Sequence, residues 1–222
     1  MRLPFTLLSW AVAILLTLPR VPGLSRENAE LRLALTQRQL DIAQLREALR
    51  HAHQAAALAQ EFTATPGIVA MVIGRSLLPT QQTLLLNRGA RDGLAQGAVA
   101  VHVAGVVGRL TDLSPSTALV VLLTDPDSRV SGLIERSRET GLLVGRGLGQ
   151  CELIYLNADA DAQEGDRVLT AGLGGSFPKG LLLGVITRVI RDESTGSAWA
   201  QVNPAAQLGR VEEVLCLPHS AP

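Results

Sequence analysis

The chain has 222 residues and a formal net charge of zero, with 20 basic and 20 acidic side chains. It therefore has no overall field to hold it on nucleic acid or an anionic lipid surface, and aromatic residues, at 3%, are too scarce for a base-stacking site. The hydrophobic fraction of 47% suffices for a buried core and excludes a wholly disordered chain.

We expect the first 24 residues to anchor the chain in a membrane. An apolar run extends from Leu3 to Leu18, and about 16 residues of helix reach about 24 Å, short of the ~30 Å hydrocarbon core. A helix continued to Leu24 spans this core if Arg20 reaches back to the headgroups. A cleaved signal peptide is the alternative, although Pro22 sits where its cleavage motif belongs. Under both interpretations the rest of the chain is exported.

Residues 25–63 are predicted to form a coiled-coil helix. No Pro or Gly interrupts the segment from Ser25, the expected N-cap, to Phe62, and strong helix formers dominate it. Alternating steps of three and four residues give a heptad seam of about five repeats, with Asn28 and Arg38 as polar members. The seam predicts a homodimer, and packing on the chain's own globular domain is the alternative. The residues expected to carry dimerisation are Leu31, Leu35, Ile42, Leu45 and Leu49.

Residues 67–217 are predicted to form a mainly β domain built as two small β-barrels of six-stranded type. Beyond Pro66 the helical period ends, and short runs of Val, Ile and Leu are separated by Gly, Asp and Pro about every eight to twelve residues. Strands are expected at residues 68–73, 83–86, 98–103, 106–110, 119–123, 130–134, 142–144, 152–156, 167–170, 183–190, 198–202 and 214–217.

Two parts of this domain are similar to each other. A turn and strand at 92–101 precede Gly-Val-Val-Gly-Arg-Leu at 105–110, and a turn and strand at 162–168 precede Gly-Val-Ile-Thr-Arg-Val at 184–189. In each part a Gly turn leads into an outgoing strand, and the returning strand carries Gly-Val. The pattern predicts two barrels of related design.

Catalytic and metal-binding motifs are missing from the sequence. Neither Gly-x-Ser-x-Gly nor His-Glu-x-x-His occurs. His51 and His53 lie two residues apart on a helix, whereas a metal site on one face needs a spacing of three or four. The other two histidines are His102, in an expected strand, and His219, near the C-terminus. We therefore predict no enzyme and no catalytic, cofactor or metal site.

Other segments that suggest chemistry have structural interpretations. The Gly-rich segment 171–180 invites comparison with a phosphate loop, but its Lys179 leads into a strand and not a helix. Cys151 and Cys216 either form one disulfide in an exported domain or are two buried apolar residues in strands. The acidic side chains expected to cap their own turns are Asp125, Asp127, Asp159 and Asp161.

The motifs of the β domain form an ordered set. Asn-Arg-Gly at 87–89, Gly-Val-Val-Gly-Arg at 105–109 and Leu-Leu-Thr-Asp at 122–125 precede a more specific string, Gly-Leu-Gly-Gly at 172–175 with Phe-Pro-Lys-Gly at 177–180. This set resembles the rod shape-determining protein MreC family. The resemblance marks a group of residues as structural or partner-binding: Asn87, Gly89, Asp92, Gly93, Gly108, Arg109, Asp125, Gly165, Asp166, Gly172, Gly174, Gly175, Phe177, Pro178, Gly180 and Gly184.

The resemblance implies a single-pass protein of the bacterial inner membrane with its C-terminal domain in the periplasm. One barrel is then discontinuous, comprising roughly 67–120 with 200–217, the other covers 121–199, and residues 218–222 form a tail. The implied function is that of a non-catalytic scaffold of the cell-elongation machinery, which maintains cell shape by organising peptidoglycan synthases. The implied partners are a second copy, a class B penicillin-binding transpeptidase, MreD and, indirectly because almost no cytoplasmic tail is seen, the MreB system.

Two other functions remain as alternatives at this point. A periplasmic adaptor of an export complex also joins an anchor, a coiled coil and β-barrels, but it requires a helical hairpin, and one long helical segment is seen here. An exported double-barrel hydrolase requires a His and an Asp in one barrel and a Ser in the other, which leaves His102 as its single candidate base.

Overall fold

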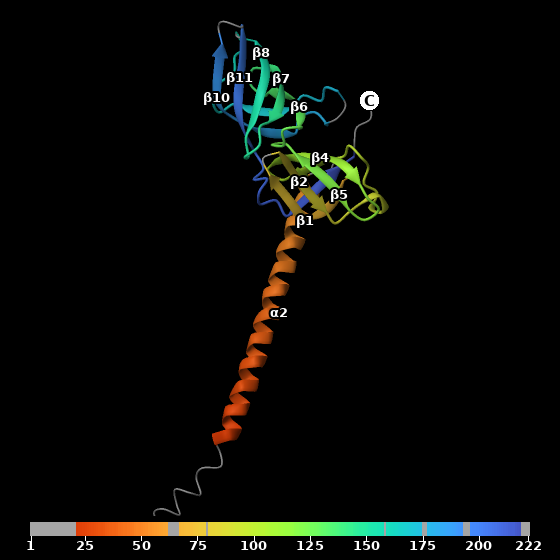
Figure 1. Ribbon diagram of the computed structural model, residues 1–222, viewed down its shortest axis with the longest axis vertical. Helices are drawn as coiled ribbons and strands as arrows, with labels where there is room; N and C mark the ends of the chain where they lie inside the picture. Colours follow the sequence, from red (N-terminus) through yellow and green to blue (C-terminus); the bar gives the residue numbers. More distant parts are fainter. Residues whose placement is uncertain are drawn as a thin grey trace, which may run out of the picture. The chain divides into compact units, whose positions relative to one another are not determined.

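The computed structural model describes residues 21–61, 67–78, 80–157, 159–174, 177–192 and 196–218. The chain divides into two compact units between His51 and Ala52. Figure 1 shows a long helix followed along the chain by the strands of the β domain. The elements in chain order are α2 (Val21–Glu61), β1 (Ile68–Leu78), β2 (Gln81–Leu86), η1 (Ala90–Asp92), β3 (Val99–His102), β4 (Gly105–Leu113), β5 (Ala118–Leu122), β6 (Arg129–Ile134), β7 (Thr140–Gly145), β8 (Cys151–Asn157), β9 (Arg167–Thr170), β10 (Leu182–Asp192), β11 (Ser197–Pro204) and β12 (Glu213–Leu217).

The long helix α2 begins earlier than the sequence pattern indicates. It starts at Val21, so Ser25 lies inside the helix, and its assignment as the N-cap is wrong. Pro22 is tolerated near the start because the first backbone N–H groups of a helix have no partner within it. The predicted seam residues are exposed, from 48% for Ile42 to 69% for Leu45.

The predicted anchor falls mainly on residues 1–20, which lie outside the described part of the chain. Within the part that is described, no helix is long and apolar enough to cross a bilayer. The predicted tail also lies outside it, apart from Pro218.

The first barrel is closed by a strand from the far end of the chain. Its strand order is β1-β12-β3-β4-β5-β2. Strand β12 enters between β1 and β3, where Leu215 pairs with Val69 on one side and with Val101 on the other. Five strands of the first barrel therefore precede the second barrel in the sequence, and the sixth follows it.

The second barrel, in the order β10-β11-β8-β7-β6-β9, has the same circuit of strands as the first. Going round from β12, the first barrel runs β12-β3-β4-β5-β2-β1, and going round from β6 the second runs β6-β9-β10-β11-β8-β7. Strand β12 thus takes the place of β6, so the first barrel is a circular permutation of the second. Two closed six-stranded barrels after an N-terminal helix confirm the predicted fold class.

The internal similarity predicted from the sequence has a counterpart in matching hydrogen bonds, but the returning strands align three residues away from the predicted register, with Gly108 and not Gly105 in the place of Gly184. In the first barrel the N–H of Gly97 donates to the carbonyl of Leu110 at 3.0 Å, and in the second the N–H of Gly165 donates to the carbonyl of Ile186 at 2.8 Å. Both glycines have positive φ, 84° and 90°. The same turn therefore opens β3 in one barrel and β9 in the other, which confirms the related design.

The glycines of the two Gly-Val strands also have one role. A Cβ at Gly108 would fall on the carbonyl oxygen of Val121, and a Cβ at Gly184 would fall on that of Asn203. In each case the facing strand approaches too closely for a side chain. Both glycines are therefore required by packing between strands.

The barrel interiors are aliphatic. Successive side chains of β5 point to opposite faces of the sheet and alternate between buried and half-buried. Phe177 is the one aromatic side chain in the buried cluster of the described residues, at 7% exposure. The largest fully buried side chains are Leu84, Leu86, Leu110, Leu122, Leu123, Ile134, Leu143, Leu153, Leu183, Ile186 and Leu217.

The expected subdomain boundaries cut two strands. A boundary at 120–121 divides β5, which continues because Leu122 still pairs with Gly108 of β4. A boundary at 199–200 divides β11, which continues because Pro204 still pairs with Gly184 of β10. Strand β5 thus belongs wholly to the first barrel, and β11 belongs wholly to the second.

Both cysteines are free and buried, Cys151 in β8 and Cys216 in β12. Of the two interpretations, the structure selects buried apolar residues in strands and not a disulfide. Burial raises the pKa of each thiol to about 12.

Candidate functional site

Asp125 fixes the chain where it leaves the first barrel for the second. The side chain is 3% exposed. One carboxylate oxygen accepts the N–H of Gln82 at 2.6 Å, and the other accepts the N–H of Asp127 at 2.8 Å. Thr124 also donates a side-chain hydrogen bond to Gln82. These contacts hold the link between the barrels against β2, and they account for Asp125 as the cap of its own turn.

A groove of ≈590 Å³ lies beside this link. The outer faces of β2, β4 and β5 contribute Thr83, Arg109 and Val121, and the Gly-rich loop of the second barrel contributes Phe177. Among the motif residues, the groove thus brings Arg109, Asp125 and Phe177 together. Its lining mixes hydroxyl, charged and apolar groups, which suits contact with a polypeptide surface better than chemistry on a small substrate.

The Asn-Arg-Gly motif shapes the turn between β2 and β3. Asn87 exchanges hydrogen bonds with Met71 of β1, because its side-chain oxygen accepts the Met71 N–H at 2.8 Å. Asp92 accepts the N–H of Gly89 at 2.9 Å and an Arg88 guanidinium N–H at 2.8 Å. The Gly89 hydrogen bond and the Arg88 hydrogen bond lower the pKa of Asp92. Gly93 follows with φ of 92°.

The corresponding loop of the second barrel is held by a charged network. Arg136 donates Nε and Nη2 to the carboxylate of Asp166 at 2.8 and 2.9 Å, and it also binds the carboxylate of Asp161. Asp166, 8% exposed, also accepts the N–H of Gln163 at 2.9 Å. Hydrogen bonding to Arg136 lowers the pKa of Asp166. Asp161 thus contributes to this loop by binding Arg136 and the side-chain amide of Gln163.

Backbone geometry and local hydrogen bonds shape the Gly-rich loop. Gly172 has φ of 76°, and a Cβ there would meet the Cβ of Lys179 at 2.8 Å. Thr170 donates to the carbonyl of Pro178 and accepts the N–H of Leu181 at 2.9 Å. Gly174 and Gly180 also have positive φ, whereas Gly175 lies outside the described residues.

His102 makes a local hydrogen bond in the turn between β3 and β4. Its Nδ1 accepts the N–H of Ala104, two residues along the same turn, at 3.3 Å. Burial lowers its pKa, and the carboxylate of Glu213 acts in the opposite direction. The imidazole therefore takes part in the β3–β4 turn.

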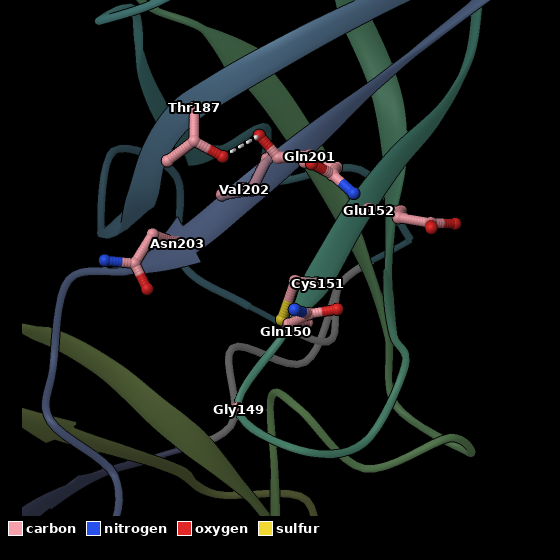
Figure 2. A pocket seen from close by; sticks show the side chains of 8 residues that line it. All are labelled: Gly149, Gln150, Cys151, Glu152, Thr187, Gln201, Val202 and Asn203. Atoms are coloured by element: carbon pink, nitrogen blue, oxygen red, sulfur yellow. Dashed lines mark hydrogen bonds between the residues drawn. The ribbon is translucent and has the colours of Figure 1, made fainter.

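A second pocket, of ≈160 Å³, opens at one end of the second barrel, between β8, β10 and β11 (Figure 2). The Cys151 thiol donates to the carbonyl of Leu123 at 3.4 Å, and Glu152 pairs with Arg146 at 2.5 Å. Thr187 donates to the carbonyl of Gln201, the dashed contact in Figure 2. Burial raises the pKa of the Cys151 thiol, which makes it a poor nucleophile, and the Glu152 carboxylate is engaged by Arg146.

Sequence reasoning missed an aromatic pair on the second barrel. Tyr155 is 76% exposed and has φ of 63°, and Trp199 is half-buried on the adjacent strand. Trp199 stands opposite a bulge in β8, because the register shifts between Ala198 and Ala200. The scarcity of aromatic residues was the signal that could have directed attention to these two positions.

The chain is similar to proteins of one family. A family model described as "Rod shape-determining protein MreC, barrel core" matches residues 72–218. A "Cell shape-determining protein MreC" of Cereibacter sphaeroides is 36% identical over 121 residues, which is 54% of this chain and 40% of the relative. The crystal structure of MreC from Pseudomonas aeruginosa matches with a TM-score of 0.66 and 30% identity, covering 68% of this chain and 99% of that chain.

A chain in the complex between Penicillin-Binding Protein (PBP2) and MreC from Helicobacter pylori has the same fold, with a TM-score of 0.55 at 19% identity and coverage of 69% of this chain and 98% of that chain. The present chain spans between 36% and 58% of the length of these curated relatives, and 40% of the first of them. The matched family model nevertheless covers most of the β domain and more than half of the chain. The chain therefore belongs to the rod shape-determining protein MreC family.

Proposed function

We propose that this chain is a non-catalytic periplasmic scaffold of the bacterial cell-elongation machinery, which helps to set cell shape by binding a peptidoglycan synthase of the PBP2 type. One observation carries the proposal: the polar motif residues of both barrels are used to fix turns and the inter-barrel link. Asp125, Asp92 and Asp166 all accept backbone N–H groups. What the domain offers to other molecules is its outer surface.

The choice of partner follows from family membership and from the Helicobacter pylori complex of PBP2 and MreC. The groove beside Asp125 supports binding of a protein, because it combines apolar side chains with Arg109 and hydroxyl groups. Within this proposal, the motif residues act mainly by giving the barrels their shape, and they contact a partner only where they line that groove.

The proposal includes a single-pass anchor in the inner membrane at residues 1–24 and a homodimer formed through α2. Five apolar seam residues are exposed along the helix, which supports self-association. The partners MreD and, indirectly, MreB belong to the same proposal by family membership. The adaptor alternative has less support, since it requires a returning helix and the described residues contain one long helix.

Depletion in the bacterium that encodes this chain tests the function. We expect the cells to lose their rod shape and the incorporation of new wall along their sides. Wild type and His102→Ala are both expected to restore them, because His102 has a turn contact and no catalytic role. Normal shape after depletion contradicts the scaffold proposal, and failure of His102→Ala with normal protein levels favours the hydrolase instead.

A further inference from the structure

Two stretches of chain cross between the barrels, and the hairpin of β1 and β2 contacts both of them. The outgoing crossing, residues 123–128, joins β5 to β6, and the return crossing, residues 205–212, joins β11 to β12. Both barrels belong to one compact unit of the chain. The contacts of the two crossings therefore decide how the second barrel is set on the first.

The outgoing crossing is bonded to both barrels. On the side of the first barrel, the carboxylate of Asp125 accepts the N–H of Gln82 at 2.6 Å, and both residues are 3% exposed. On the side of the second barrel, the carbonyl of Thr124 accepts the N–H of Gly147 at 2.8 Å. A buried hydrogen bond is costly to leave unmade, because its donor and acceptor then lack water as well. This crossing is therefore the fixed joint between the barrels.

The return crossing is joined to the barrels by backbone hydrogen bonds at its two ends. The N–H of Ala205 donates to the carbonyl of Leu183 in β10 at 3.0 Å, and the N–H of Val72 in β1 donates to the carbonyl of Glu212 at 2.8 Å. Residues 206–211 lie between these two bonds. What fixes the main chain of this middle part decides whether the crossing keeps one path.

Arg75 of β1 binds the main chain of this middle part. Its Nη2 donates to the carbonyl of Val211 at 2.7 Å, and its Nη1 donates to the carbonyl of Gly209. The rigid guanidinium fork reaches two acceptors at once. Leu208 and Val211 are also buried, but apolar packing is non-directional, whereas the two guanidinium bonds fix the path of the main chain. Because Arg75 is exposed, water can replace these bonds at lower cost than the buried bonds of the outgoing crossing.

The barrels also touch each other directly at Gly105, the first residue of β4. A Cβ there would meet the carbonyl oxygen of Leu182 at 2.6 Å and the Cβ of Ala205 at 3.0 Å. The start of β4 in the first barrel thus lies against the start of β10 and the start of the return crossing. So close a contact requires one setting of the barrels, and a turn of the second barrel about the outgoing crossing separates these atoms.

We propose that the outgoing crossing is a hinge between the barrels and that Arg75 is the latch that holds them in one orientation. Hinges of this kind are a few residues between elements that absorb the change in backbone angles. The latch goes beyond the proposed function and does not depend on the identity of a partner. It acts on the groove, which takes Thr83 and Arg109 from the first barrel and Phe177 from the second. Release of Arg75 therefore changes the width of the groove.

Distances between spin labels on the two barrels test the latch. The labels are attached through two exposed positions, Ser116→Cys in the first barrel and Glu164→Cys in the second. Cys151 and Cys216 are 1% and 2% exposed and are too buried to react. The full chain, in detergent, is mixed with an excess of unlabelled chain, so that distances within one chain are measured. Double electron–electron resonance gives the distribution of these distances.

Two variants at the latch are compared with one control. We expect the wild type to give one narrow distribution and Arg75→Ala to give a broader distribution with a displaced maximum. Arg75→Lys keeps the charge but not the fork, and it should broaden the distribution less. Arg188→Ala is the matched control, because Arg188 is also an exposed arginine that follows a bulge in its strand, but its side chain makes no hydrogen bond with the described residues. It should keep the wild-type distribution.

Hydrogen exchange in β12 shows whether the first barrel stays closed in the variants. If β12 keeps its protection, a broader distribution in Arg75→Ala supports the latch, and an unchanged distribution overturns it. If Arg75→Ala loses protection in β12, Arg75→Lys decides by the same two outcomes. Loss of protection in both variants, or several distances in the wild type, overturns the latch. None of these results bears on the proposed function, which partner binding tests separately.

Discussion

Single glycines in this protein are required where two strands come too close for a side chain. We expect Gly108→Ala and Gly184→Ala each to destabilise the fold by about 1–3 kcal/mol, the usual cost of overpacking, because the new Cβ falls on a carbonyl oxygen of the facing strand. Urea denaturation of the variants measures this. Gly209→Ala is the control, since nothing lies within 4 Å of a Cβ there, and equal stability of all three variants contradicts the prediction.

The two arginines that bind aspartates in the loops of the barrels differ in the burial and the number of the carboxylates they bind. Arg136 binds an aspartate that is 8% exposed and a second carboxylate, whereas Arg88 binds an aspartate that is 26% exposed and, among the described residues, no second carboxylate. Arg136→Ala should therefore lower the urea midpoint clearly, because Asp166 loses both guanidinium hydrogen bonds. Arg88→Ala should change the midpoint little, as is usual for a solvent-screened pair. The reverse order is the outcome that contradicts this account.

His102 should make stability depend on pH. Burial lowers its pKa in the folded chain, whereas the unfolded chain takes up a proton below about pH 6.5. Between these two pKa values the unfolded state binds more protons than the folded state. The contribution of His102 to the free energy of unfolding is therefore complete above about pH 6.5 and is lost as the pH falls through the pKa of the folded chain. Urea denaturation at several pH values measures it. We expect His102→Gln to remove this part of the pH dependence and the exposed-helix variant His53→Gln to retain it.

At the scale of elements, the helix is predicted to self-associate through one face. Ile42→Gln with Leu45→Gln should dissociate the dimer, because each buried aliphatic side chain contributes roughly 1.5–3 kcal/mol. Sedimentation of the full chain in detergent measures the mass. Leu33→Gln with Leu40→Gln is the control, since these leucines are as exposed but lie on the opposite side of the helix from the seam. An unchanged mass for the seam variant contradicts the prediction.

The strands could be predicted from sequence because each is a short apolar run bounded by turn residues. All twelve expected segments overlap an observed strand. The helix start was misplaced because Ser25 is a good N-cap by type, while the helix runs on to Val21 through Pro22. The bulge at Tyr155 could not be predicted, since a positive φ there is imposed by the pairing of β8 with β11 and not by the residue type. The contacts of Asp125 and Arg136 could not be predicted either, because they link positions far apart in the sequence.

At the scale of the whole β domain, the circular permutation explains why the chain must be complete before the first barrel closes. Strand β12 supplies the place that β6 fills in the second barrel, and it pairs with both β1 and β3. Deletion of residues 213–217 should therefore open the first barrel and expose its core, whereas the second barrel keeps all six strands. Hydrogen exchange should show lost protection in β1 and β3 and retained protection in β8 and β11. Equal loss in both barrels contradicts this independence.

The central claim is that this chain acts by binding a penicillin-binding protein and not by catalysis. Crosslinking of the full-length chain in the cells that encode it, followed by identification of the crosslinked proteins, tests that claim most directly. We predict that a PBP2-type transpeptidase is among the main products. Products dominated by subunits of an export complex, with no penicillin-binding protein, would contradict the account.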